Sequence, residues 1–134
     1  MGLNLERHPR VVLADDHPPV LAALGRLLSA CCDVIASVSG GCAAVEAVNR
    51  LKPDVLVVDL MMPDIDGLEV CRRVKRLAPE TAIVMITAFD DSDVRTAAFR
   101  DGASAFVAKH DAARTLNDTI RRVVAEKNDL PLPS

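Results

Sequence analysis

The sequence contains few aromatic residues. Among its 134 residues there is no Trp and no Tyr, and the three Phe residues, Phe89, Phe99 and Phe106, all fall within residues 89–106. Since 50% of the residues are hydrophobic, the chain must build its core from aliphatic side chains. Single-stranded nucleic acids stack on aromatic side chains, so this composition excludes a binding platform of that kind.

Two other absences narrow the class of protein. No apolar run approaches the ~20 residues that span a membrane, and residues 1–10 lack the apolar core of a signal peptide. The 16 basic and 19 acidic residues give a net charge of −3, whereas duplex-binding domains have a basic excess. We therefore expect a soluble, cytoplasmic chain of one-domain length that contacts no membrane and does not bind nucleic acid directly.

The cysteines and histidines show no metal-binding pattern. The four cysteines, Cys31, Cys32, Cys42 and Cys71, form no C-x-x-C pair, and the three histidines are scattered without ligand spacing. The sequence predicts reduced, partly buried thiols.

Short apolar runs alternate with amphipathic segments along the chain. The apolar runs span residues 11–14, 34–36, 55–58, 82–86 and 105–108. Each precedes a segment with apolar residues at helical spacing, such as Leu21, Leu24 and Leu28 in the first. Uninterrupted apolar strands are typical of a parallel sheet covered on both faces, and right-handed crossovers distribute the helices over both faces. The pattern predicts an α/β fold: a doubly wound, five-stranded parallel sheet built as (βα)5.

The helical segments carry two more specific expectations. In the third segment, the predicted buried stripe consists of Leu68, Cys71, Val74 and Leu77. Phe99 lies on the fourth segment, where we expect it to pack in the core.

Polar side chains stand where four of the apolar runs end. The first run is followed by Asp15 and Asp16, the third by Asp59, the fourth by Thr87 and the fifth by Lys109. Parallel strands end at a common edge of the sheet, which is where ligands bind in open α/β sheets. Alone, each residue has a structural explanation as a helix cap, a turn former or a surface lysine. Those explanations do not account for the placement of all of them at strand ends.

The chemistry of this set points to a metal and a phosphoryl group. Three crowded carboxylates, Asp15, Asp16 and Asp59, repel one another and need a cation. Oxygen ligands without His or Cys favour Mg²⁺ or Mn²⁺ over zinc, and Mg²⁺ binds a few carboxylates together with phosphoryl oxygens. An Asp can be the nucleophile that forms an aspartyl phosphate, Lys109 can neutralise phosphoryl charge, and Thr87 can donate a hydrogen bond to it.

These residues carry a family resemblance. The features are the acidic pair Asp15-Asp16, the block D-L-M-M-P-D-I-D-G over residues 59–67, Ile86-Thr87-Ala88, and the segment 102–109 that ends in Lys109. Over residues 10–127 the chain resembles the receiver domain of response regulators in two-component signalling. The resemblance implies a flavodoxin-like, CheY-like fold with strand order 2-1-3-4-5. Residues 1–9 would then be an N-terminal extension, and residues 128–134 a tail or the start of a linker.

The resemblance also implies roles for individual residues. Asp59 would be the phosphoacceptor, and Asp16 and Asp59 would bind Mg²⁺ directly, together with the backbone carbonyl of Met61. Asp15 would act through a metal-bound water. Lys109 would contact the phosphoryl group. The remaining implied roles concern switching, in which Thr87 moves toward the phosphoryl group and Phe106 changes rotamer.

The implied partner is a sensor histidine kinase. The implied output face consists of the fourth helix, the last strand and the last helix, through which the chain would dimerise on phosphorylation. Residues 15–18, D-D-H-P, resemble the NarL/FixJ-type subfamily, whose receivers precede a helix-turn-helix domain. We therefore expect control of transcription through a domain outside this chain, the alternative being a stand-alone receiver or phosphorelay intermediate. The chain would not be an enzyme beyond phosphorylating and dephosphorylating itself.

Some positions depart from the family pattern or control access to the site. His110 stands where many receivers have Pro, so we expect a trans peptide bond before it. The resemblance places Met61, Ala88 and Phe89 beside the entrance to the site. Met61 and Phe89 are bulky and apolar, so they offer no group to orient water, and we expect slow autodephosphorylation.

Three rival functions agree less well with the sequence. A Mg²⁺-dependent phosphatase with an Asp nucleophile would need a second Asp where Met61 stands. A flavin or nucleotide binder would need a Gly- or Ser/Thr-rich loop after the first strand, but residues 15–19 are acidic and stiffened by proline. A receiver that no longer switches by phosphorylation would not require the complete residue set.

Overall fold

The five strands form one parallel sheet in the order β2-β1-β3-β4-β5. This computed structural model describes residues 8–128. The strands are β1 (Arg10–Ala14), β2 (Asp33–Val38), β3 (Val55–Asp59), β4 (Ala82–Thr87) and β5 (Ala105–Ala108). The predicted fold class and strand order are confirmed, including the edge position of the second strand.

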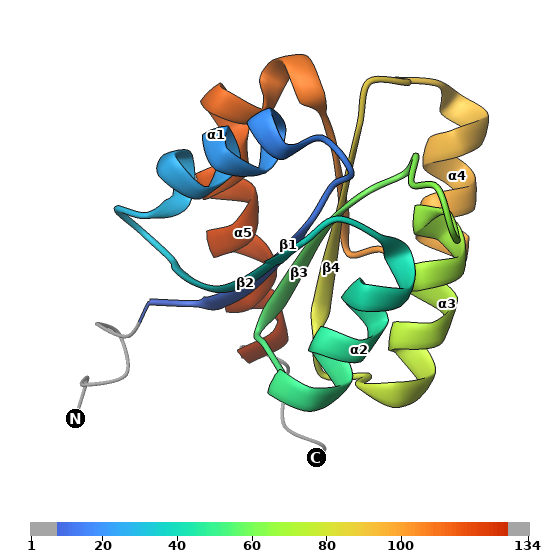
Figure 1. Ribbon diagram of the computed structural model, residues 1–134, viewed down its shortest axis with the longest axis horizontal. Coiled ribbons are helices and arrows are strands. Elements are labelled where there is room, and N and C mark those ends of the chain that lie inside the picture. Colours follow the sequence, from blue (N-terminus) through green and yellow to red (C-terminus); the bar gives the residue numbers. More distant parts are fainter. Residues whose placement is uncertain (1–7, 129–134) are drawn as a thin grey trace.

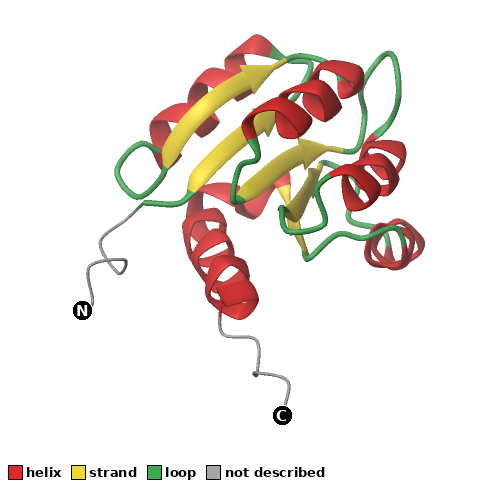
Figure 2. Ribbon diagram, turned by 90° about the horizontal axis from the view of Figure 1, so that it is seen from below, coloured by secondary structure: helices red, strands yellow, loops and turns green. Residues whose placement is uncertain are grey.

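Helices cover both faces of the sheet and give the molecule three layers (Figures 1 and 2). They are α1 (Pro18–Leu28), α2 (Gly41–Leu51), α3 (Gly67–Leu77), α4 (Ser92–Arg100) and α5 (Ala112–Asn128), and the 3-10 turn η2 (Lys109–Asp111) joins β5 to α5. α1 and α5 lie on one face, and α2, α3 and α4 lie on the other.

Alternate residues of the central strands supply the two core layers. In β1, Val11 and Leu13 pack with α1 and α5, whereas Val12 and Ala14 pack with the helices of the other face. β3 and β4 are buried along their whole length. This two-sided burial explains why their sequences are uninterrupted apolar runs. The half-exposed β2 contains the shortest apolar run, residues 34–36, because this strand lies at the edge of the sheet.

Two expectations about helix faces are wrong. Leu77 is 47% exposed, because it is the last residue of α3 and the buried positions of that helix are Gly67, Val70, Cys71 and Val74. Phe99 is 46% exposed. Its neighbour Ala98 is the only fully buried residue of α4, and adjacent helical residues point about 100° apart.

The loop between β3 and α3 is tied to α2 by Asp64. The carboxylate of Asp64 accepts the backbone N–H groups of Gly41 and Cys42, each at 2.9 Å, and so caps a helix whose own N-cap residue, Gly40, has no side chain. The N–H groups of Cys42, Gly41 and Ile65 hold the pKa of Asp64 well below its usual range. The loop after Asp59 is therefore fixed at its far end.

Gly67 brings the start of α3 against the end of β3. A Cβ atom at Gly67 would lie 2.7 Å from the backbone oxygen of Asp59 and 2.9 Å from the Cα of Leu60. Only glycine permits this approach without a backbone shift, so residue 67 sets the position of α3 relative to Asp59.

The described residues include little of the predicted terminal segments. Of the predicted extension 1–9 and tail 128–134, only residues 8, 9 and 128 lie within the described residues. Among the helices of the described part, none is long and apolar enough to cross a membrane.

Gly67→Ala is expected to lower the free energy of unfolding by about 1–3 kcal/mol, because the added methyl group overpacks against backbone atoms that cannot move aside. Gly25→Ala is the matched control, since a Cβ at Gly25 in α1 meets nothing within 4 Å, and it should stabilise by about 0.5–1 kcal/mol. Urea unfolding followed by circular dichroism measures both variants. Equal effects of the two substitutions would contradict the close approach at Gly67.

Candidate functional site

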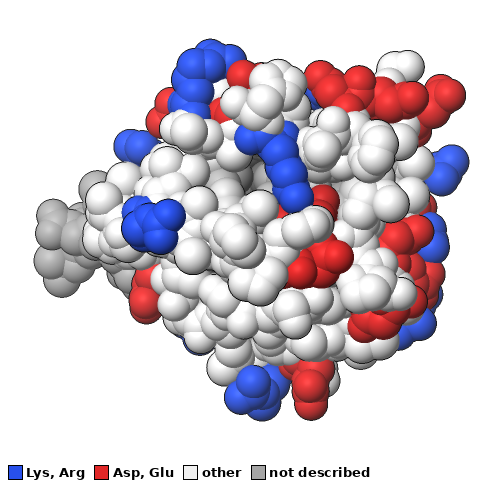
Figure 3. Space-filling model, turned by 45° about the horizontal axis from the view of Figure 1, so that its top comes forward, with Lys and Arg blue, Asp and Glu red and all other residues white. Residues whose placement is uncertain are grey.

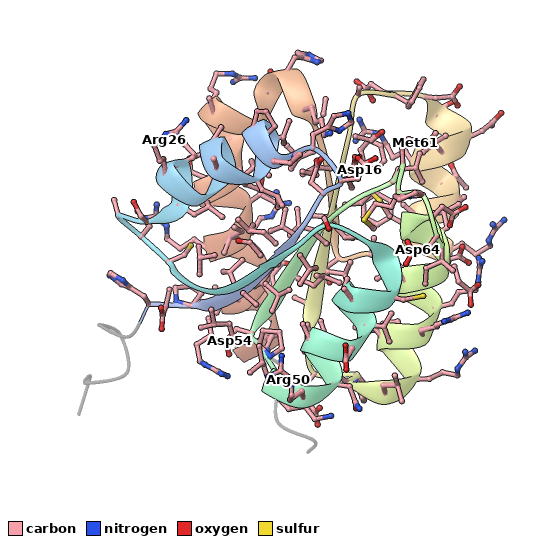
Figure 4. The ribbon with its side chains drawn as sticks, in the orientation of Figure 1. Asp16, Arg26, Arg50, Asp54, Met61 and Asp64 are labelled. Carbon is pink, nitrogen blue, oxygen red and sulfur yellow. The ribbon has the colours of Figure 1, made fainter. Side chains whose placement is uncertain are left out.

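The strand ends bring the predicted site residues to one edge of the sheet. Asp59 and Thr87 are the last residues of β3 and β4, and Asp15 and Lys109 directly follow β1 and β5. The register is continuous, with Asp59 opposite Ile86 and Thr87 opposite Ala108. Asp16 and Met61 lie at this edge in Figure 4, and Asp54 lies at the opposite end of the sheet.

The ammonium group of Lys109 contacts two buried carboxylates. Its Nζ lies 2.8 Å from Oδ2 of Asp15 and 3.1 Å from Oδ2 of Asp59. Asp15 is 0% exposed and Asp59 is 2% exposed, so both acids depend on partners in the protein. Lys109 itself is partly exposed. On the face of the molecule in Figure 3, acidic and basic side chains stand close together near the centre of the view.

Positive charge at the site falls short of the negative charge. Asp15, Asp16 and Asp59 bring three carboxylates, and Lys109 brings one ammonium group. Burial raises the pKa of Asp59 even though the Lys109 ammonium works against this. Burial also acts to lower the pKa of Lys109, but the carboxylates of Asp15 and Asp59 outweigh it and raise that pKa.

The donor set fits a hard divalent cation. Oδ1 of Asp16 is buried and has no hydrogen-bond partner among the described residues, and the buried Oδ2 of Asp15 contacts the Lys109 ammonium without an aligned hydrogen bond. Asp15, Asp16, His17 and Asp59 each offer one ligand atom, and these atoms lie within 4.8 Å of one another. Oxygen atoms of this kind, with surplus negative charge, are ligands for Mg²⁺ and Mn²⁺.

His17 is a member of this cluster that the sequence did not predict. The histidines show no ligand spacing along the chain, but in the folded structure Nδ1 of His17 lies 2.9 Å from Oδ1 of Asp16. His17 is the N-cap residue of α1 with extended backbone angles (φ −107°, ψ 109°), and the ring folds back toward the carboxylates. Its place directly after the acidic pair at a strand end was the signal available in the sequence.

Thr87 lies at the same edge of the sheet, but its hydroxyl group bonds to the backbone and not to the acidic cluster. It is fully buried, and its hydroxyl oxygen accepts the backbone N–H of Phe89 at 3.0 Å. Ala88 and Phe89 are exposed, as is the side chain of Met61. The three residues predicted to control access therefore lie at the surface around the strand ends.

Phe106 is held in the core by β4 and α4. It is 9% exposed and pairs with Met85 across the sheet. The guanidinium carbon of Arg95 lies 4.6 Å from the centre of its ring, and Arg95 also forms a 2.7 Å ion pair with Asp90. This cation–π contact fixes the one aromatic residue that the sequence predicted to switch.

An open groove of about 810 Å³ lies beside Phe106, along α4, β5 and α5. Its charged lining residues alternate in sign: Asp90, Arg95, Asp111, Arg114, Asp118 and Arg122.

The connection from β5 to α5 is the 3-10 turn η2, residues 109–111. All peptide bonds of the described residues are trans, as expected for the bond before His110.

Comparisons with known proteins agree on one family. The sequence matches the family described as response regulator receiver domain over residues 11–121. Response regulator MprA of Mycobacterium leprae is 36% identical over 115 residues, which cover 86% of this chain and 50% of that protein. Response regulator protein VraR of Staphylococcus saprophyticus is 30% identical over 115 residues, which cover 84% of this chain and 55% of that protein.

Solved structures give the same result. The signal receiver domain of a protein named as the response regulator NarL, from Mycobacterium tuberculosis, has 28% sequence identity and a TM-score of 0.86, and the match covers 90% of this chain and 98% of that one. The chain spans about half the length of the curated relatives it matches.

Asp59→Asn is expected to raise the free energy of unfolding by on the order of 1 kcal/mol at about pH 7 in a chelating buffer, because it removes a buried and incompletely balanced charge. The pKa of Asp59 is raised by folding, so the wild-type chain loses stability relative to the variant as the pH rises from the unfolded value of about 4 through the folded value. Urea unfolding across this pH range measures the difference.

The control for this measurement is Asp118→Asn, which removes a carboxylate that is 84% exposed. It should change the free energy of unfolding by less than about 0.5 kcal/mol. The charge imbalance would be refuted by a wild-type chain that is more stable than Asp59→Asn at every pH.

Proposed function

Because the chain belongs to the response regulator receiver domain family, we propose that Asp59 accepts a phosphoryl group from a sensor histidine kinase. The chain is a receiver domain of two-component signalling, and the resemblance to NarL/FixJ-type receivers is confirmed at family level. The observation that carries the proposal is the buried Asp59 carboxylate at a strand end, 3.1 Å from the Lys109 ammonium and surrounded by further acids.

The reaction follows from the position of Asp59. A carboxylate oxygen of Asp59 attacks the phosphorus of a phosphohistidine, an O–P bond forms, and the P–N bond breaks with its electron pair going to the leaving imidazole, which takes a proton from water. The phosphoryl group carries about −1.5 to −2 charge and replaces the single negative charge of the Asp59 carboxylate. Lys109 already contacts Asp59, so its ammonium group is placed to pair with a phosphoryl oxygen.

We propose that Mg²⁺ or Mn²⁺ would be held by Asp16, Asp59 and the backbone carbonyl of Met61. Asp15 would act through a bound water. Such an ion, when bound, supplies the positive charge that three carboxylates and a phosphoryl group require. The excess of three carboxylates over the one ammonium group of Lys109 supports this part of the proposal.

Switching would depend on Thr87 and Phe106. The Thr87 hydroxyl has a proton to donate to a phosphoryl oxygen, and moving toward it would break the bond from the N–H of Phe89. The space released beside β4 would let Phe106 leave its contact with Arg95. We propose that phosphorylation shifts the population between these two packings and so reshapes the α4-β5-α5 groove, through which a second copy would dock.

The exposed rim bears on how long the phosphoryl group lasts. Met61 and Phe89 are 54% and 55% exposed, and neither side chain has a polar group able to orient an attacking water. Ala88 is likewise exposed and apolar. Slow autodephosphorylation therefore stays a prediction that this apolar rim supports.

The output is proposed from the relatives rather than from the site. This chain spans about half of MprA and VraR, which are both response regulators. We propose a cytoplasmic protein that controls transcription through a helix-turn-helix domain outside this chain, the alternative being a stand-alone receiver or phosphorelay intermediate. In either case it acts as a phosphoacceptor and not as an enzyme with a separate substrate.

Asp59→Asn is expected to abolish labelling by radioactive acetyl phosphate in the presence of Mg²⁺, because the amide oxygen of Asn is not a competent nucleophile. Asp93→Asn, which changes an exposed carboxylate in the first turn of α4, is the control and should label like the wild type. Label that persists in Asp59→Asn would overturn the assignment of the phosphoacceptor. Mass spectrometry of the intact chain gives the stoichiometry.

A further inference from the structure

The imidazole of His17 stands beside the acidic cluster without a role in the local structure. It is the N-cap residue of α1, yet its side chain makes no capping hydrogen bond, and the ring is 65% exposed. The backbone of His17, and not its ring, forms the hydrogen bonds at the start of α1. Its carbonyl accepts the N–H groups of Val20 and Leu21, and its N–H donates to Oδ1 of Asp15. The ring is therefore free to take a ligand.

The ring nitrogen and the carboxylate oxygens converge at separations typical of ligands around one ion. Nδ1 of His17 lies 2.9 Å from Oδ1 of Asp16 and 3.4 Å from Oδ1 of Asp15. Oδ1 of Asp16 nevertheless has no hydrogen-bond partner in the described part of the chain, so the close approach to Nδ1 is not an aligned hydrogen bond. Neighbouring ligand atoms of an octahedral ion lie about 3.0 Å apart when each bond is about 2.1 Å long.

The two oxygens of Asp15 face different partners. Its Oδ2 lies 2.8 Å from the ammonium of Lys109, and its Oδ1 lies on the side of His17. The side chain of Asp15 is fully buried, and Oδ2 has no aligned hydrogen bond among residues 8–128. Lys109 therefore leaves Oδ1 of Asp15 on the side of the half-buried Asp16 and the exposed ring of His17.

We propose that His17 is a nitrogen ligand that makes this site favour divalent ions of the first transition row, with Mn²⁺ as their probe, over Mg²⁺. This inference rests on the proposed function, because it places the ion at the same carboxylates. Imidazole binds transition ions well, whereas Mg²⁺ strongly prefers oxygen. Mn²⁺ accepts the same oxygen ligands as Mg²⁺, so the ratio of the two affinities isolates the contribution of the ring.

The test is isothermal titration calorimetry with Mg²⁺ and with Mn²⁺ on the wild type, His17→Gln and His110→Gln. The ratio of Mn²⁺ affinity to Mg²⁺ affinity should fall about tenfold or more in His17→Gln, since even the outer partners of metal ligands are worth about 10–100-fold. His110→Gln is the matched control, because His110 is 74% exposed and its Nε2 lies 3.7 Å from the carboxylate of Asp111, outside the acidic cluster. Its ratio should equal that of the wild type.

A spectroscopic measurement reports the bond directly. In protein carrying ¹⁵N-labelled histidine, pulsed electron paramagnetic resonance of bound Mn²⁺ should show coupling to an imidazole nitrogen in the wild type and in His110→Gln, but not in His17→Gln. Coupling that survives in His17→Gln, or an affinity ratio that does not change there, would overturn the inference.

The outcomes separate this inference from the proposed function. If Mg²⁺ supports labelling of Asp59 and the ratio is the same in His17→Gln and the wild type, only the role of His17 is wrong. If neither ion binds the wild type, the metal site in the proposed function fails and the inference fails with it.

Discussion

The contact of one ammonium group with two buried carboxylates is the interaction on which the site depends. Lys109 reaches Asp15 and Asp59 only because β5, β1 and β3 run parallel and end at one edge of the sheet. The contact makes burial of these acids tolerable, but one ammonium group still faces the three carboxylates of Asp15, Asp16 and Asp59. That deficit supports the proposed cation, whose positive charge would in turn offset the negative charge of a phosphoryl group on Asp59.

The surrounding packing keeps this unfavourable arrangement in place. Gly67 lets α3 pack directly on the backbone of Asp59, and Asp64 ties the same loop to the start of α2. On the same face of the sheet, Phe106 lies under the guanidinium group of Arg95 from α4. The loop after Asp59 is thus fixed by α2 and α3, and the predicted switch residue is held by α4.

Most of the fold and the main site residues could be predicted from the sequence, because both depend on where apolar runs stop. Asp59, Thr87 and Lys109 are recognisable because each stands where a buried apolar run stops, and the ends of parallel strands lie at one edge of the sheet. The exposure of Phe99 and Leu77 could not be predicted, because it depends on which face of a short helix meets the sheet. The approach of His17 to the acids was missed for a related reason: it depends on backbone angles at a helix cap and not on residue spacing.

The most direct test of the account is a comparison of amide and side-chain NMR spectra with Mg²⁺ alone and with Mg²⁺ plus the phosphoryl analogue beryllofluoride. Formation of the beryllofluoride adduct at Asp59 should shift the signals of Thr87, Phe89, Arg95 and the Phe106 ring, and these changes should be absent in Asp59→Asn. Changes confined to the neighbours of Asp59, with Arg95 and Phe106 unmoved, would contradict a site whose occupation at Asp59 controls the packing of α4.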